Sequence, residues 1–263
     1  MHPVAQLLWW QVPTYGLLAL MGLVAGLVVA HERGRRDGWA WRDVVVPGLA
    51  AEAGGVIGAP LWSAVVEQWA LVGAFQWQAL VGRGGLSIVG GLSLGAFAGW
   101  VAVRWRGMPF VRWLDVAAPG AAIGVAFGRL GCFFNGCCYG RPTLFPVAVV
   151  FEHSETAARP LGVPLHPTQL YAAAGLLLLA VVLWHVRAHP PGRRAGWFLV
   201  GYAVLRVGVE TLRADYRGYV FDLPATAVAA SVIGLVGVAL VLSGRAAATP
   251  ELGGTDGRST ETT

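Results

Sequence analysis

The chain has 263 residues, of which 56% are hydrophobic and only 13% are charged. A soluble protein of this length would carry about 25% charged residues, so the composition argues against one. The 12 tryptophans and 37 glycines are typical of a helical protein that crosses a membrane several times. The net charge of +5 comes from arginines dispersed between apolar segments, so we expect no nucleic-acid partner.

Seven apolar stretches follow one another along the chain. Most are long enough to cross about 30 Å of hydrocarbon, so we predict an all-α integral membrane protein with about seven transmembrane helices. The first stretch lacks the features of a cleavable signal peptide and is expected to remain as a span. The stretches are 15–30, 44–65, 86–103, 116–134, 170–186, 196–212 and 225–242.

Two irregular features interrupt this series. The second stretch contains Gly54, Gly55, Gly58 and Pro60, so we expect its helix to be kinked or broken there. The following segment, 67–83, is too polar to span and is expected to lie at the membrane interface.

The arginines predict the orientation of the helices. Loops 31–42, 104–112 and 187–194, together with the C-terminal tail, hold twelve of the 19 basic residues, whereas the opposite loops hold five. The positive-inside rule then places the N-terminus outside and the C-terminus in the cytoplasm. We expect residues 1–245 to form one polytopic transmembrane domain and residues 246–263 to form a disordered cytoplasmic tail.

Sixteen residues at the end of the fourth stretch, Gly128–Thr143, combine charge, flexibility and thiols. They include Arg129, Asn135, Gly140 and Arg141, and three cysteines. A half-buried arginine keeps its charge and needs a partner or a ligand, and glycines let a ligand approach the backbone. We interpret this stretch as a site for an anion such as a phospholipid phosphate. The alternative is an arginine that reaches the interface beside a glycine-rich turn.

A polar stripe runs along the sixth stretch. Tyr202, Arg206, Glu210 and Arg213 are spaced at i, i+4, i+8 and i+11, which puts them on one narrow face of a helix. Such a face should point into the bundle or toward a wet cavity, and Arg206 and Glu210 can form an ion pair. The alternative is a pair that only holds helices together.

Three further candidates carry weaker signals. Gly84–Gly91 opens the third stretch, where small residues serve either close helix packing or the binding of an anion by backbone amides. His166 lies at the outer interface, where it is either solvated or handles a proton, and Thr168 two residues later is a candidate N-cap. Tyr15 either anchors the first helix at the interface or reaches toward a lipid headgroup.

The three cysteines, Cys132, Cys137 and Cys138, lie within seven residues of one another. Adjacent cysteines do not readily bridge, and this spacing does not match a zinc-binding pattern. We therefore expect no disulfide framework and no metal site, and treat the three as small buried residues. The alternative is thiol or redox chemistry at these cysteines.

Four motifs resemble those of the prolipoprotein diacylglyceryl transferase family, in the family's order. Residues 128–141 are similar to its Gly-Arg-x-Gly-Asn-Phe-x-Asn-Gly-Glu signature, and 166–171 to its His-Pro-Ser/Thr-Gln-Leu-Tyr motif. Residues 202–210 resemble its Tyr-x-x-x-Arg-x-x-x-Glu stripe, and 13–17 its first-helix Tyr-Gly element.

The resemblance implies a transferase of the bacterial cytoplasmic (inner) membrane with its active site toward the external, periplasmic face. Such an enzyme moves the diacylglyceryl group of phosphatidylglycerol to the thiol of a lipobox cysteine in a secreted prolipoprotein. It would contact membrane lipids and require no cofactor. The implied catalytic residues are Arg129, Arg206, Tyr202, Glu210 and His166. The implied substrate-binding residues are Tyr15, Gly90, Gly91, Asn135, Gly140, Arg141 and Arg213.

The sequence departs from the family at three positions. Val89 stands before Gly90 and Gly91 where the family has His-Gly-Gly, and valine cannot accept a proton. Cys132 and Cys137 replace the asparagine and the glutamate of the signature. The alternative is therefore an altered paralog that binds anionic phospholipid or uses a different acceptor.

Overall fold

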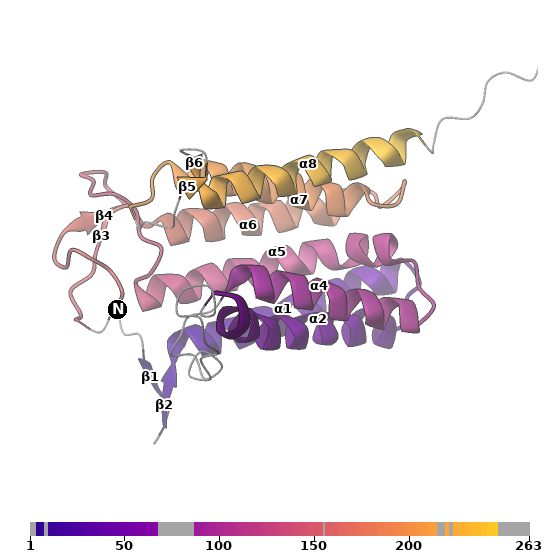
Figure 1. Ribbon diagram of the computed structural model, residues 1–263, viewed down its shortest axis with the longest axis horizontal. Coiled ribbons are helices and arrows are strands. Elements are labelled where there is room, and N and C mark those ends of the chain that lie inside the picture. The colour runs from indigo at the N-terminus through magenta and orange to yellow at the C-terminus, as the bar shows by residue number, and fades with distance from the viewer. Residues whose placement is uncertain are drawn as a thin grey trace, which may run out of the picture.

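The computed structural model describes residues 4–7, 10–67, 87–154, 156–214, 219–220 and 223–246. Within these residues the chain forms seven α-helices (Figure 1). They are α1 (Thr14–Arg36), α2 (Trp41–Trp62), α4 (Ile88–Trp105), α5 (Phe110–Asn135), α6 (Thr168–His185), α7 (Arg193–Glu210) and α8 (Ala225–Ala246). A π-helical turn, η1 (Ser63–Glu67), continues α2.

Short antiparallel strands join some of these helices. They form three separate pairs: β1 (Val4–Leu7) with β2 (Trp10–Pro13), β3 (Val149–Val150) with β4 (Pro164–Leu165), and β5 (Tyr219–Val220) with β6 (Leu223–Pro224).

The seven helices coincide with the seven predicted stretches, which confirms an all-α integral membrane protein. Five are long and apolar enough to cross a membrane: Thr14–Arg36, Trp41–Val65, Phe110–Asn135, Thr168–His185 and Thr226–Ser243. Helix α7 is more polar, because it carries Arg193, Arg194, Arg206 and Glu210. The predicted interfacial segment after Glu67 and the tail after Ala246 lie outside the described residues.

Helix α2 is not broken at its glycines, so of the two predicted alternatives, a kink or a break, the break is wrong. It runs without interruption to Trp62, and the backbone changes to a π-helical turn only after Pro60. The glycines bring α2 close to α4 instead. A Cβ atom added at Gly54 would lie 2.7 Å from the Leu94 carbonyl oxygen and 2.8 Å from the Ala98 Cβ.

Helix α5 lies at the centre of the bundle. It contacts α1 on one side and α6 and α7 on the other, while α2 packs mainly on α4, and α8 on α7 (Figure 1). Small residues allow these contacts, for example where Ala118 and Ala122 of α5 meet Ala180 and Leu183 of α6. The fold therefore consists of two groups of helices joined along α5.

A buried network of hydrogen bonds and an ion pair joins three elements at one end of the bundle. The Asp115 carboxylate of α5 accepts hydrogen bonds from the backbone N–H groups of Gly192 (2.7 Å) and Ala195 (2.8 Å) at the start of α7. The fully buried Arg194 donates to the Asp115 carbonyl oxygen at 2.8 Å. Its guanidinium also lies 3.9 Å from the Asp37 carboxylate, in the loop between α1 and α2.

The arginine-rich loops gather at this same end. Besides the contact between Arg194 and Asp37, Arg106 after α4 pairs with Asp43 of α2 at 2.6 Å. Arg36 at the end of α1 stacks on Trp184 of α6, with its guanidinium carbon 4.7 Å from the ring centre. Loops 31–42, 104–112 and 187–194 thus share one end of the molecule, as the topology prediction requires.

Residues 136–154 and 156–167 form a segment at the opposite end of the bundle. Phe151, Ala158 and Leu165 are buried in its own small core, against which Phe133 of α5 packs. The pairing of β3 with β4 closes this segment. It covers the end of α5 that carries the predicted anion site.

Candidate functional site

A pocket opens where α5 ends, α6 begins and α7 ends. Three of its lining side chains, Arg129, Arg206 and Arg213, are cations. The remaining lining residues are Cys138, Thr168, Gln169, Ala172, Leu176, Tyr202, Leu205 and Val209. Three positive charges in a largely apolar wall make an environment for an anion, since permanent guanidinium charges there need a counter-charge.

One carboxylate orients two of these arginines. Glu210 forms the predicted ion pair with Arg206 in α7, and its Oε2 atom lies 3.9 Å from Nε of Arg213. The side chains of Arg206 and Glu210 are only 9% and 10% exposed. Thr226 of α8 donates a hydrogen bond of 2.7 Å to the same carboxylate. Because α7 ends at Glu210, Arg213 belongs to the turn that follows rather than to the helical stripe.

Arg129 reaches the pocket from α5, close to the first helix. A Cβ atom added at Gly131 would lie 2.9 Å from the Tyr15 ring, so the glycine leaves room for Tyr15 beside α5. Tyr15 is 45% exposed and lies within electrostatic range of Arg129 and Cys132. The structure therefore brings the predicted first-helix tyrosine next to the arginine signature.

The start of α6 holds the turn after α5 in place. Thr168 donates its hydroxyl hydrogen to the Cys138 carbonyl oxygen at 2.6 Å, and Gln169 donates from Nε2 to the Cys137 carbonyl oxygen at 2.7 Å. The prediction that Thr168 is an N-cap is wrong, because Pro167 occupies that position and Thr168 is already helical. Its hydroxyl binds the neighbouring turn instead of its own helix.

His166 and the Gly140–Arg141 pair meet beside the pocket. Gly140 and His166 share a backbone hydrogen bond of 3.0 Å, and Arg141 donates to the Arg213 carbonyl oxygen at 3.3 Å. The His166 ring forms a hydrogen bond of 3.2 Å with the Tyr171 hydroxyl. Gly140 admits no side chain, since an added Cβ would lie 2.6 Å from the His166 Cβ.

The remaining predicted residues lie in two places. Asn135, the last residue of α5, is half-buried and accepts a backbone hydrogen bond of 2.9 Å from Ala157. Gly90 and Gly91 lie in the interface between α4 and α2, where their close contacts are with α2. In the described part of the chain, the predicted residues that do not line the pocket are Tyr15, Gly90, Gly91, Asn135, Gly140, Arg141, His166 and Glu210.

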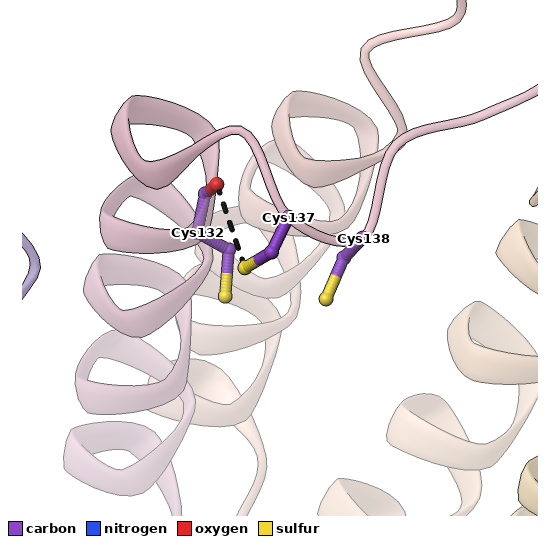
Figure 2. A group of neighbouring side chains, drawn as sticks. All are labelled: Cys132, Cys137 and Cys138. Carbon is purple, nitrogen blue, oxygen red and sulfur yellow. Dashed lines mark hydrogen bonds between the residues drawn. The ribbon is translucent and has the colours of Figure 1, made fainter. Parts of the chain in front are cut away.

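The three cysteines meet at the end of α5. Their sulfur atoms lie within 4.8 Å of one another, on the same side of the turn (Figure 2). Cys137 donates from its thiol to the Cys132 carbonyl oxygen at 3.7 Å. The hydrogen bond with Cys132 lowers the pKa of the Cys137 thiol, but the hydrogen bond with Cys138 and burial raise it, and the net pKa is raised. None of the three cysteines forms a disulfide bond.

Gln169 is a site residue to which the sequence reasoning assigned no role. It is 1% exposed and lines the pocket, and its Oε1 atom is buried without a hydrogen-bond partner among the described residues. It is an acceptor in a pocket rich in donors, so it suits a ligand hydroxyl group. The signal that could have found it is the motif of residues 166–171, in which it is the glutamine.

Comparison with known proteins matches almost the whole chain. A family model described as "Prolipoprotein diacylglyceryl transferase" matches residues 3–243. The chain is 32% identical to the phosphatidylglycerol–prolipoprotein diacylglyceryl transferase of Clostridium tetani, over 78% of this chain and 82% of that protein. Proteins of the same name from Nitratidesulfovibrio vulgaris and Methylococcus capsulatus are 35% and 34% identical. Those alignments cover 76% of this chain and 75% and 76% of the two relatives.

Proposed function

The chain belongs to the prolipoprotein diacylglyceryl transferase family, and we propose that it moves the diacylglyceryl group of phosphatidylglycerol to a prolipoprotein cysteine. The acceptor would be the thiol of the lipobox cysteine in a secreted protein, and the product would be a thioether. The observation that carries this proposal is the convergence of Arg129, Arg206 and Arg213 on one pocket. These three residues come from α5, α7 and the turn after α7.

The pocket suits both the donor lipid and the leaving group, which differ in negative charge. The phosphodiester of phosphatidylglycerol carries one negative charge, which arginine binds through paired N–H donors. When the thiolate attacks the glyceryl carbon, the carbon–oxygen bond breaks and glycerol phosphate leaves with an added negative charge. Cations already in position stabilise the transition state, in which this charge develops, more than they stabilise the ground state. This difference accelerates the reaction. Tyr202 would donate a further hydrogen bond, and Gln169 would accept one from the headgroup.

The proposal includes a location and an orientation. We place the protein in the bacterial cytoplasmic membrane, with the pocket toward the external face where secreted acceptors arrive. The arginine-rich loops lie at the end of the bundle remote from the pocket, and the positive-inside rule assigns that end to the cytoplasm.

A second candidate function rests on Val89. This residue, at the place of the family histidine, is 50% exposed and offers no atom that accepts a proton. A protein that binds anionic phospholipid without turnover, or one that uses a different acceptor, would keep the arginines and dispense with that base.

Transfer in proteoliposomes tests the first candidate. Purified protein is combined with phosphatidylglycerol and a lipobox peptide, and the thioether product is followed by mass spectrometry. We expect Arg129→Ala and Arg206→Ala to lower the rate about 10²–10³-fold, the usual cost of losing a donor that stabilises a developing anion. Arg112→Ala is the matched control, because Arg112 is an exposed arginine at the other end of the same helix α5.

The outcomes separate the two candidates. Wild-type transfer with loss in both pocket variants supports the transferase. Phosphatidylglycerol-dependent thermal stabilisation that requires Arg129, without thioether product, supports the binding protein. Full transfer by both arginine variants would refute the role given to the pocket.

A further inference from the structure

We propose that Cys132, Cys137 and Cys138 bind a zinc ion whose fourth coordination position takes the acceptor thiol. The metal would thereby perform the deprotonation for which Val89 provides no base. The role of the metal rests on the proposed transferase function, whereas the metal site itself rests on the geometry of the three thiols.

The thiols are close enough to share one ion. A zinc–sulfur bond is about 2.3 Å long, so two sulfur atoms of a tetrahedral site lie about 3.8 Å apart. The three sulfur atoms lie within 4.8 Å of one another (Figure 2). Each pair therefore needs to close by about 1 Å at most, which small rotations of the side chains provide.

The backbone holds the ligands in a built arrangement. Cys138 has a φ of 65°, a left-handed conformation that is uncommon outside glycine and that marks functional positions. The Cys137 and Cys138 carbonyl groups are fixed by Gln169 and Thr168 at 2.7 and 2.6 Å. A turn that is held by its neighbours loses little entropy when it binds a metal.

The number of ligands points to an activating site rather than a structural one. In the described part of the chain, the cluster holds three thiols and no histidine or carboxylate as a fourth member. Structural zinc sites use four protein ligands, whereas catalytic sites use three and leave one position for water or substrate. The acceptor in the proposed reaction is itself a thiol, a ligand of the same chemical type.

The position of the cluster fits this role. Cys138 lines the same pocket as Arg129, Arg206 and Arg213, so a bound acceptor sulfur would lie beside the phosphate site. A zinc ion with four thiolates carries a net charge of −2, and the arginines compensate it. This negative charge keeps the bound sulfur nucleophilic.

The chemical step balances without a further reactant. The acceptor thiol loses its proton to water when it binds zinc, because a coordinated thiol is deprotonated. Its sulfur then forms a bond with the glyceryl carbon, and the electron pair of the broken carbon–oxygen bond goes to the phosphate of the leaving glycerol phosphate. The thioether is a weaker ligand than the thiolate and leaves the metal.

Cobalt substitution tests the site directly, because thiolate ligands give Co²⁺ a charge-transfer absorption in the near ultraviolet. The reduced full-length protein in detergent is titrated with Co²⁺, and its zinc content is measured by mass spectrometry. The chain has only 3 cysteines, so this absorption can come only from the cluster. We expect one metal per chain and no absorption in the triple Cys→Ser variant. If the triple variant does not fold, the single variant Cys137→Ser replaces it in this experiment, and thermal unfolding checks that the single variant is folded.

A lipobox peptide probes the fourth position. The cysteine peptide should intensify the cobalt absorption, and the same peptide with serine in place of cysteine should not. Removal of the metal by a chelator should slow transfer about 10²-fold, the usual contribution of proton removal to a rate, and added zinc should restore it. No metal binding, equal spectra with both peptides, or full transfer without metal would each overturn the inference.

Arg129→Ala separates this inference from the proposed function. We expect it to lose transfer while it keeps the cobalt absorption. If the cysteine variants transfer at the full rate and Arg129→Ala does not, the transferase function is supported and the role of the metal site is refuted. If wild-type protein binds metal and peptide thiol but transfers no lipid, the metal site is supported and the transferase function is refuted.

Discussion

Glu210 determines how the positive charges of the pocket are arranged. It is the carboxylate that contacts both Arg206 and Arg213, and the hydroxyl of Thr226 fixes it from α8. Without it, two guanidinium groups would face each other with little water to screen them. We therefore propose that the pair does more than hold helices together, because it positions two of the groups that would bind phosphate.

Glu210→Gln should weaken both folding and transfer. Breaking a buried ion pair leaves an uncompensated charge and costs about 3–5 kcal/mol of stability. Thr226→Val is the comparison, since it removes only a hydrogen bond to a charged group, which contributes about 1.5–3 kcal/mol. Thermal unfolding in detergent and transfer kinetics measure both effects. Equal effects of the two variants would contradict the central role of the charge.

At the scale of the helices, glycine determines how closely α2 and α4 approach. Gly54 and Gly95 each face backbone of the opposite helix: an added Cβ would lie 2.7 Å from the Leu94 carbonyl oxygen or 2.8 Å from the Ala51 carbonyl oxygen, respectively. Membrane helices gain little from the hydrophobic effect when they associate, so this close packing is a main source of their affinity. Gly90 and Gly91 belong to the same interface.

Gly54→Ala should therefore destabilise the bundle, even though alanine is the better helix former. Overpacking of this kind costs about 1–3 kcal/mol. Gly208→Ala is the matched control. Among the described residues, no atom outside the backbone of α7 and the neighbours of Gly208 lies within 4 Å of a Cβ added there, so alanine should be neutral or stabilising. The midpoints of thermal unfolding compare the two. A stable Gly54→Ala protein would argue against close contact of α2 with α4.

At the scale of the whole molecule, the helices and part of the site were predictable because their signals are local. Apolar runs give the seven helices, and the spacing of Arg206 and Glu210 gives their ion pair. The hydrogen bond between Asp115 and Gly192 was not predictable, since the two residues are 77 positions apart in the sequence. The meeting of Gln169 with the Cys137 carbonyl group, 32 residues away, was hidden for the same reason.

The orientation of the molecule can be tested by labelling engineered cysteines. Leu144 is 98% exposed at the pocket end, and Arg187 is exposed at the other end. In a protein whose native cysteines are replaced by serine, a membrane-impermeant maleimide should label Leu144→Cys on intact cells. It should label Arg187→Cys only after the membrane is permeabilised. The reverse pattern would invert the proposed topology.

The use of arginine for every cation that lines the pocket affects how the protein responds to acidity. The chain contains no lysine, and a guanidinium group keeps its proton at any pH that a cell envelope experiences. In the proposed function, the affinity of the pocket for the lipid phosphodiester would thus stay constant while the external pH changes. Any pH dependence of turnover would then report the ionisation of the acceptor sulfur rather than the capture of the lipid.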